Sequence, residues 1–437
     1  MSPAPDATVE WIAERALPIN TIELGGDFDD LMPLKDLFAD ARVVGLGEGT
    51  HGTRDYYQAQ ARLIDFLVKE CGFTAVAFEA SLADTVPLDR WVQGDGEDTL
   101  AEAGRRVSGM LYYTWNTPTV RELAIWMRDE NDRRREADEP LLRWYGYDVQ
   151  FPESAAARLK GLLTKANSPL AARVDEVMAL VEQAPPMAVN FDGSRPESDV
   201  SVADTVEATG ELLDAVKAAE AELAKTLGPA DAARVVRTAQ SLHDGRLVAN
   251  TETITERYVV RDRAMADHVA WLLDREPDLK LILWAHNGHI TKQHIRPQFR
   301  TMGDFLAERF GDDYVAVGQA SATGTYYGTG KVGMGAVPLQ PPPAGSLEET
   351  MQRAADRLDV GRFALVLPET DATGPAAWLA QPLAFRAIGT GYFENQFSQN
   401  NPAESFDVLL FHETTEADTQ LPRNTFDLPL PVDPERP

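Results

Sequence analysis

A glycine-rich turn carries the first pair of residues that could do chemistry. Glu48 and His51 stand three positions apart in GLGEGTHGTRDYY, directly after an apolar run. An imidazole beside a carboxylate can take a proton from water, because the carboxylate orients the ring and stabilises its charged form. Both residues also have ordinary structural uses, since a carboxylate can cap a helix and a histidine can be a polar turn residue. The pair alone leaves both interpretations open.

Three further apolar runs end in residues of the same chemical types. Glu79 closes VAFE, Asp148 closes WYGYD, and His286 and His289 stand in HNGH directly after LILWA. A carboxylate at Glu79 would be partly buried, which costs several kcal/mol unless the charge is paired or coordinated. Asp148 could instead cap a helix, and a lone histidine after an apolar run is more often a satisfied core residue. Four run ends that together carry acids and imidazoles indicate a shared site.

The apolar runs before these residues are typical of strands in a mostly parallel sheet. Their β-branched and aromatic character indicates burial on both faces, and helical segments of crossover length separate most of them. We therefore predict an α/β fold, with a mostly parallel central sheet flanked by helices and a helical insertion or cap. The ligand crevice of such a sheet lies at the carboxyl ends of its strands. The predicted strands cover residues 41–46, 73–80, 141–148, 279–286, 313–320, 362–368 and 406–412.

A stretch without a convincing strand divides the predicted core in two. Residues 151–278 show helical periodicity, which favours a helical insertion that caps the core. The α/β core then consists of residues 1–150 and 279–415, and residues 416–437 form an extended, Pro-rich tail. The predicted helices of the insertion cover residues 202–227, 230–248 and 252–276, with a surface loop at 184–199.

Composition limits the partners and the compartment that we expect. The chain has 437 residues and 44% hydrophobic content, which suffices for a large core. Its net charge of -28 would repel the phosphates of nucleic acids and anionic lipids, so we expect neither nucleic acid nor a membrane as a partner. The single cysteine, Cys71, cannot form an intrachain disulfide, and no signal peptide or membrane-spanning run is apparent. We expect a cytoplasmic protein and leave its oligomeric state open.

Several common catalytic motifs are missing from the chain. It contains no G-x-S-x-G, H-E-x-x-H or G-x-x-x-x-G-K-[ST] pattern. These absences argue against a serine hydrolase with a nucleophile elbow, a zinc peptidase of the H-E-x-x-H type and a P-loop protein. The remaining histidines and carboxylates could activate water by general base catalysis, or could bind a divalent metal that activates water.

The order of the motifs resembles the erythromycin esterase family. GEGTHGTRDYY, AFEAS, YGYD, WAHNGH, the helix RDRAMADHVAWLL and FDVLLFHETTEA follow one another over roughly residues 40–415. Esterases of this family open macrolide lactones by hydrolysis, and the resemblance implies an essential histidine as general base in place of a serine nucleophile. That role falls on His51, with Glu48 as its acidic companion. Glu79 and His286 match further catalytic positions.

Other positions of the resemblance are supporting or substrate-binding ones: Arg54, Asp148, His289 and Arg261. Arg261 could face the cleft, although Arg261 and Asp262 could equally be members of a structural ion pair. Many members carry a basic residue about nine positions beyond the essential histidine, where this chain has Gln60, with Arg62 nearby. This departure bears on the choice of substrate and on the stabilisation of transition-state charge.

The sequence thus predicts a hydrolase that opens an ester or a macrolide-like lactone with water activated by His51. Glu48 would orient the imidazole, and Glu79 with His286 would position the water and the developing oxyanion. We expect a small-molecule substrate and no cofactor. A metal-dependent peptidase or peptide-tailoring enzyme, with a divalent ion on Glu48, His51, Glu79 and His286, stays open as an alternative. So does an inactive protein that binds a small molecule, and the sequence leaves open whether the protein confers antibiotic resistance.

Overall fold

A nine-stranded sheet forms the centre of the molecule, with its strands in the order β1, β8, β11, β6, β2, β5, β3, β4 and with β7 paired to β6. The computed structural model describes residues 3–110, 113–185, 198–293, 299–331 and 333–421. The strands of this sheet are β1 (Leu17–Pro18), β2 (Val43–Glu48), β3 (Ala75–Ser81), β4 (Arg143–Asp148), β5 (Leu281–His286), β6 (Tyr314–Gly330), β7 (Gly333–Pro338), β8 (Arg362–Val366) and β11 (Val408–Thr415). A separate hairpin pairs β9 (Leu383–Arg386) with β10 (Phe397–Asn400).

The middle of the sheet is parallel, which confirms the predicted fold class. β2 pairs in parallel with β5 and β6, β3 pairs in parallel with β4 and β5, and β11 pairs in parallel with β6. Among its described strands the antiparallel pairs are β1 with β8, β8 with β11 and β6 with β7. Each of the seven predicted strands has a counterpart here, whereas β1, β7, β9 and β10 were not predicted.

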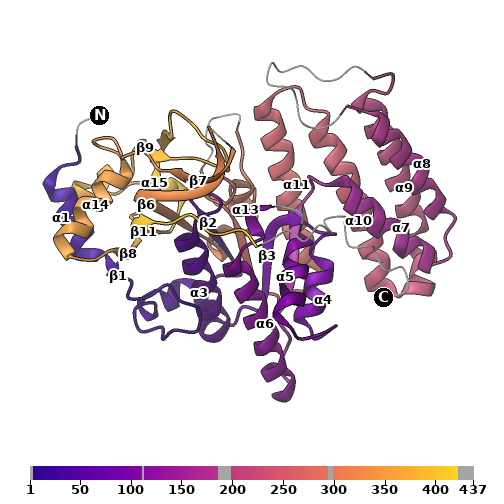
Figure 1. Cartoon of the computed structure of the whole chain (residues 1–437), viewed down its shortest axis with the longest axis horizontal. Helices are drawn as coiled ribbons and strands as arrows, with labels where there is room; N and C mark the ends of the chain where they lie inside the picture. The colour runs from indigo at the N-terminus through magenta and orange to yellow at the C-terminus, as the bar shows by residue number, and fades with distance from the viewer. Residues whose placement is uncertain (1–2, 111–112, 186–197, 294–298, 332, 422–437) are drawn as a thin grey trace.

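Helices cover both faces of this sheet (Figure 1). Val44 and Leu46 of β2 belong to one buried apolar cluster, and Val43 belongs to the other, as expected for a strand whose side chains alternate between two covered faces. The first face is covered by α2 (Lys35–Ala39), α3 (Arg54–Cys71), α4 (Val86–Val92), α5 (Leu100–Ser108) and α6 (Pro118–Glu136). The second is covered by α1 (Asp6–Arg15), α11 (Ile254–Arg275), α12 (Asn287–Ile290), α13 (Met302–Phe310) and α14 (Leu347–Leu358). The short helix α15 (Pro402–Ser405) precedes β11.

Four helices between β4 and α11 share an apolar core of their own and stand to one side of the sheet (Figure 1). Ser201 and Asp204 form a reciprocal capping box at the start of α9, which explains why this helix begins at the predicted residue. The helices are α7 (Pro152–Lys165), α8 (Leu170–Gln183), α9 (Val202–Leu227) and α10 (Pro229–Ala249). Most of the predicted loop at 184–199 lies outside the described residues. The division of the chain into domains stays a prediction.

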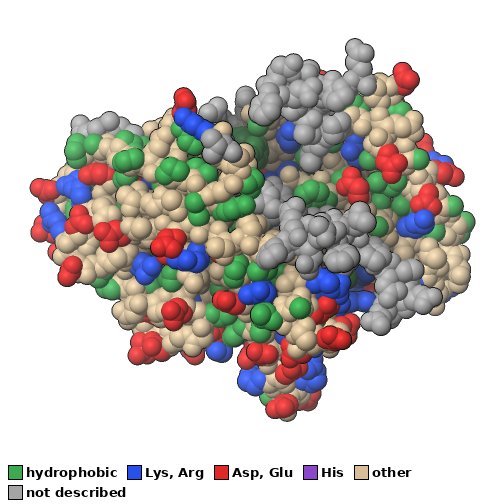
Figure 2. Space-filling view, viewed as in Figure 1, with side chains coloured by type: hydrophobic (Ala, Val, Ile, Leu, Met, Phe, Trp, Pro, Cys, Tyr) green, Lys and Arg blue, Asp and Glu red, His purple; other side chains and the backbone are tan. Residues whose placement is uncertain are grey.

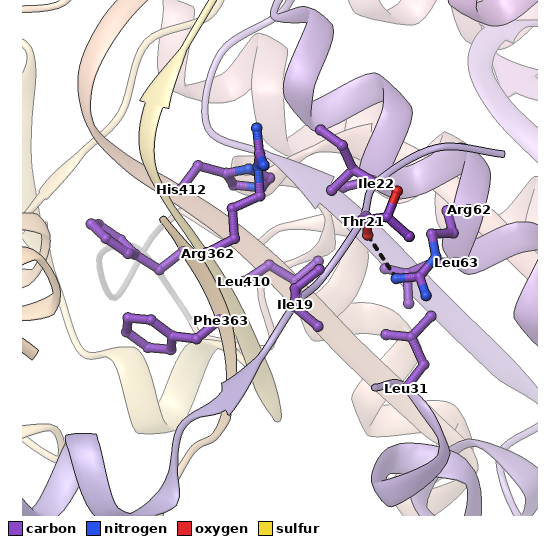
Figure 3. A pocket seen from close by; sticks show the side chains of 12 residues that line it. Ile19, Thr21, Ile22, Leu31, Arg62, Leu63, Arg362, Phe363, Leu410 and His412 are labelled. Atoms are coloured by element: carbon purple, nitrogen blue, oxygen red, sulfur yellow. Dashed lines mark hydrogen bonds between the residues drawn. The ribbon is translucent and has the colours of Figure 1, made fainter. Parts of the chain in front are cut away.

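Arg62 ties the N-terminal segment to α3. Its guanidinium donates a hydrogen bond to the Thr21 carbonyl at 2.7 Å (Figure 3). It also donates to both carboxylate oxygens of Asp30, at 2.6 and 3.2 Å. The neighbouring cavity of about 20 Å³ has room for about one water. Gln60 lies inside α3 and donates to the Leu46 carbonyl at 3.0 Å. Both residues therefore have structural partners at this position of the family resemblance.

The surface agrees with the acidic composition. Figure 2 shows Asp and Glu side chains spread over the visible face, alongside fewer Lys and Arg side chains. Among the described helices, none combines the length and the apolar character that crossing a bilayer requires. Cys71 is buried at the end of α3 and is not in a disulfide.

Candidate active site

The turn between β2 and α3 holds its conformation through contacts that leave no room for a side chain at Gly52. Its φ of +71° is in the left-handed region, and a Cβ there would lie 2.4 Å from the Tyr327 carbonyl oxygen. The Gly52 N–H donates to the Tyr57 hydroxyl at 2.8 Å, and that hydroxyl donates to the Thr114 carbonyl at 3.1 Å. The turn is thereby fixed between α3 and β6, with His51 just before Gly52.

Glu48 and His51 form a buried hydrogen-bonded pair. Glu48 ends β2, and its Oε1 contacts His51 Nδ1. Burial lowers the pKa of His51 to about 4, so the ring is neutral at pH 7. Burial also raises the pKa of Glu48 well above its ordinary value, and the nearby charge of Glu79 adds to the rise. His51 Nε2 has no hydrogen-bond partner among the described residues, so a neutral ring with its proton on Nδ1 presents a free lone pair.

Two rings lie beside His51 and fix its surroundings. The Trp115 ring centroid is 5.6 Å from that of His51, with the two planes at 90°. Trp115 Nε1–H donates to the Glu79 carbonyl at 3.1 Å, which holds the indole against the end of β3. The His286 ring centroid lies 5.3 Å from His51.

Backbone groups occupy both ring nitrogens of His286. The Gly288 N–H donates to Nδ1 at 3.1 Å, so the ring proton resides on Nε2. Nε2 lies 2.6 Å from the Ile388 carbonyl and 3.2 Å from the Gly49 carbonyl, which accept its proton. Burial, together with His51 and His289, lowers the pKa of His286 to about 3. His286 is thus a neutral brace between the end of β5 and the glycine-rich turn.

Arg261 reaches from α11 to the carboxylates at the ends of β3 and β4. Its Nη2 donates to Glu79 Oε1 at 2.6 Å and to Asp148 Oδ2 at 2.8 Å, while its Nε donates to Asp148 Oδ1 at 3.0 Å. Burial would raise the pKa of Glu79, but the His289 and Arg261 cations outweigh burial and hold it well below its ordinary value. Glu79 is therefore ionised, and Arg261 forms a forked pair with Asp148.

His289 shares the Glu79 carboxylate with Arg261. His289 Nε2 lies 3.3 Å from Glu79 Oε1, and its Nδ1 lies 2.7 Å from Asp262 Oδ1. Burial would lower the pKa of His289, but Asp262 and Glu79 outweigh burial and raise it well above its ordinary value. Arg261 Nη1 is 3.2 Å from His289 Nε2, so these two cations lie next to each other and share the Glu79 carboxylate. The other Asp262 oxygen accepts from the Met302 N–H at 3.0 Å, which also fixes α13.

Arg54, another residue singled out from the sequence, lies apart from this cluster. It begins α3, and its half-exposed guanidinium pairs with Glu416, just after β11. Its backbone N–H donates to the Glu416 carbonyl at 2.8 Å. In the described part of the chain, Arg54 forms no hydrogen bond or ion pair with the other predicted site residues. The structure thus brings together Glu48, His51, Glu79, Asp148, Arg261, His286 and His289, and leaves Arg54 outside.

Two buried polar residues join the site without having been predicted as members. Asp262 was considered only as an ion-pair partner of Arg261, yet it binds His289. Its place on the apolar stripe of α11, three and seven residues before Met265 and Val269, could have indicated burial. Gln319 of β6 donates to the Gly47 carbonyl at 2.9 Å, and so braces the strand end that carries Glu48.

Of the four residues considered as metal ligands, only His51 and Glu48 keep a donor atom without a partner in the described residues, at Nε2 and Oε2. His51 Nδ1 contacts Glu48, both nitrogens of His286 have backbone partners, and Glu79 binds two cations. Across the described residues, no group of three or more His, Cys, Asp or Glu side chains has a geometry suited to a metal ion. The side chains do suit proton transfer at His51, beside a cluster of fixed charges.

The amino-acid sequence of the chain is similar to the sequences of one known protein family. A sequence model described as erythromycin esterase matches residues 68–415, which include the residues at the ends of β3, β4 and β5. The chain is 26% identical over 412 residues to the putative hydrolase YbfO of Bacillus subtilis (strain 168), covering 88% of this chain and 86% of that protein. It is 24% identical over 342 residues to erythromycin esterase type II of Escherichia coli, covering 72% and 77%.

A solved structure extends the likeness to the whole fold. A crystal structure of a Bacillus cereus protein matches with a TM-score of 0.79 at 21% identity, over 96% of this chain and 99% of that one. At that identity the match shows a shared fold and no more. The family sequence model covers well over half of the chain, from α3 to the end of β11, and on that basis the chain belongs to the erythromycin esterase family.

Proposed function

We propose that the protein hydrolyses an ester or lactone with a water molecule that His51 activates. The observation that carries this proposal is a buried imidazole that is neutral at pH 7, with Nδ1 held by Glu48 and Nε2 free of partners in the described residues. A neutral imidazole with a free lone pair is the form that a general base requires. As Nε2 takes a proton from water, the water oxygen forms a bond to the carbonyl carbon, and the π electrons of the carbonyl move to its oxygen. When the carbonyl forms again, the bond from its carbon to the alcohol oxygen breaks, and the proton held by the His51 and Glu48 pair passes to that leaving oxygen.

Glu48 lowers the free energy that this proton transfer requires in a buried site. A buried imidazolium is unfavourable, as the lowered pKa of His51 indicates. The raised pKa of Glu48 means that its carboxylate readily accepts the Nδ1 proton when Nε2 gains one. The pair then carries no net charge in the transition state. Because the two groups share a hydrogen bond, their titration belongs to the pair.

Arg261 and His289 supply the positive field for the developing oxyanion. Glu79 raises the pKa of His51, and each of the two cations lowers it to a smaller extent, so the field of all three groups reaches its ring. The field of the two cations stabilises negative charge on a carbonyl oxygen that lies beside the ring, because fixed charges in a site with little water act strongly. Glu79, Asp148 and Asp262 hold the two cations in place. We assign His286 to the positioning of the glycine-rich turn, because its ring nitrogens already have backbone partners.

The test is incubation of wild type and His51→Ala with a panel of esters and lactones, including a macrolide, followed by mass spectrometry. We expect wild type to add one water to at least one substrate, and His51→Ala to lose ~10²- to 10⁴-fold of the rate. His243→Ala is the matched control, because His243 is a half-buried histidine on α10, outside the site. Full activity in a folded His51→Ala variant would overturn the proposal.

The same experiment separates the alternatives. A second incubation with a chelator leaves metal-free hydrolysis unchanged, whereas loss of activity with chelator would favour a metal-dependent enzyme. Tight binding of a small molecule without turnover, unaffected by His51→Ala, would favour an inactive binding protein. The name of the Escherichia coli relative supports a macrolide lactone as the first substrate to try, while its 24% identity leaves the range of esters wide.

A further inference from the structure

A cavity of about 350 Å³ lies between the edge strand β4 and the inserted helices. Its walls come from α4, β4, α7, α10 and α11, and β4 is the last strand of the sheet on this side. On α11 the cavity is lined by Trp271 and Arg275, at least ten residues beyond Arg261. A helix rises about 15 Å over ten residues, so this cavity is separate from the site around His51. Its size suits a small molecule.

The lining of this cavity is basic, although the chain as a whole has a net charge of -28. Seven basic residues line it against three acidic ones, a formal excess of four positive charges. The basic residues are Arg90, Arg143, Arg158, Lys165, Arg234, Arg237 and Arg275, and the acidic ones are Asp89, Asp231 and Glu276. An acidic protein that gathers so many arginines around one cavity creates a local positive potential there.

Two of the acidic residues already have partners. Arg143 binds Asp89 through two hydrogen bonds of 3.1 and 2.9 Å, and Arg234 pairs with Asp231 at 2.7 Å. Glu276 accepts a long hydrogen bond of 3.4 Å from the Tyr145 hydroxyl. The acidic groups of the lining therefore do not neutralise the remaining arginines.

Arg237 and Arg158 are two buried cations of this lining that form no ion pair with a carboxylate in the described part of the chain, although Asp244 and Asp267 act on Arg237, and Asp231 on Arg158, from a greater distance. Arg237 Nε and Nη2 are buried and have no hydrogen-bond partner in the described part of the chain. The guanidinium lies 5.9 Å from the Trp271 ring centroid, beside the cavity. Arg158 likewise has no hydrogen bond or ion pair within the described ranges. Burial lowers the pKa of both arginines to about 10, and Arg90 and Arg234 contribute to the shift at Arg158.

We propose that this cavity binds a small molecule with two or more negative charges on phosphate or carboxylate groups. Buried guanidinium nitrogens that lack hydrogen-bond acceptors destabilise a fold, and a multiply charged oxyanion removes that cost by accepting their hydrogen bonds. Arginine suits this ligand because its planar fork matches the oxygens of phosphate and carboxylate. The site is independent of ester hydrolysis, so its test does not depend on the activity of His51.

The test is isothermal titration calorimetry of the full chain with pyrophosphate and, separately, with citrate, at low ionic strength. We expect at least one of the two anions to bind wild type, and binding to weaken as salt is added. Arg237→Gln and Arg158→Gln should each weaken it by about tenfold or more, because each removes a charged hydrogen-bond donor. The anion that binds more tightly identifies the chemical class of the ligand.

Arg173→Gln is the matched control, because Arg173 is an exposed arginine on α8 that pairs with Glu211 and does not line the cavity. It should bind as wild type does. The melting temperature gives a second readout. Without anion, Arg237→Gln should melt no lower than wild type, because the substitution removes a buried charge that has no ion-pair partner. With anion present, the melting temperature of this variant should not rise. Absence of binding to wild type, or equal binding to Arg237→Gln, would overturn the proposal.

Discussion

Glu48→Gln tests whether the carboxylate of Glu48 takes up a proton during turnover. Glutamine keeps the size of the side chain and can still accept a hydrogen bond from His51 Nδ1, but it cannot accept the proton itself. The His51 imidazolium would then have to form inside the buried site. The pKa of His51 is about 4, which is three units below pH 7. Protonating the ring at pH 7 costs about 1.4 kcal/mol for each of these units. The barrier should rise by about 4 kcal/mol, which lowers kcat/KM about a thousandfold at pH 7.

The pH profile gives this prediction a second readout. In wild type the acidic limb reports protonation of the Glu48 and His51 pair, and it lies above pH 4.5 because burial raises the pKa of Glu48. In the variant only His51 remains to be protonated, so the limb should move down towards pH 4. The assay is kcat/KM between pH 4 and 8 on the best substrate of the panel.

Glu348→Gln provides the control for loss of a buried acid. Glu348 is fully buried outside the site, burial raises its pKa to about 7, and its Oε1 accepts from the Arg386 N–H at 2.7 Å. This variant should keep the wild-type pH profile and turnover. The reasoning would be refuted if folded Glu48→Gln retained more than about a tenth of the activity at pH 7, or if its acidic limb did not move.

Three further changes test the supports of the site. Arg261→Lys keeps the charge but loses the fork to Asp148, so we expect about 2 kcal/mol less stability in urea unfolding, and an unchanged midpoint would contradict this. His289→Gln removes a group whose pKa is raised in the folded state. The free energy of unfolding of wild type should therefore exceed that of the variant most below pH 6.5, and the difference should shrink as pH rises through the folded pKa. A constant difference between pH 6 and 9 would count against the assignment. Gly47→Ala places a Cβ 2.3 Å from Asn287 Oδ1, and the resulting shift of β2 should lower kcat by about 10²-fold, which steady-state kinetics would measure.

The sequence located most of the site because the site depends on strand ends. Apolar runs with few interruptions predict parallel strands, and parallel strands bring their carboxyl ends to one edge, so Glu48, Glu79, Asp148 and His286 could be grouped before any coordinates were known. The register of β2 and β5 agrees with this grouping, because Glu48 pairs directly with His286 in the sheet. The antiparallel strand β7 was harder to predict, because its residues are mostly glycine and small or exposed side chains.

The roles within the group could not be derived in the same way. The partners of His286 include the carbonyl of Ile388, about a hundred residues later in the chain, so the sequence could not show that its ring nitrogens are engaged. Arg54 matches the family resemblance and still points to Glu416, because the first residue of α3 lies beside the end of β11. Contacts between segments that are far apart in the sequence determine which histidine ring nitrogens have hydrogen-bond partners. Such contacts form only through tertiary packing.

The helix α11 does more than cover one face of the sheet. Glu79 and Asp148 end two neighbouring buried strands, and two carboxylates in such a place would repel each other and lose solvation. Arg261 neutralises both, and Asp262 of the next helical position holds His289 as a cation against Glu79. Arg261, one of the two cations that hold the pKa of Glu79 low, therefore reaches that carboxylate only when α11 is docked. It follows that docking of α11 assembles the charged half of the site, while the glycine-rich turn builds the proton-accepting half.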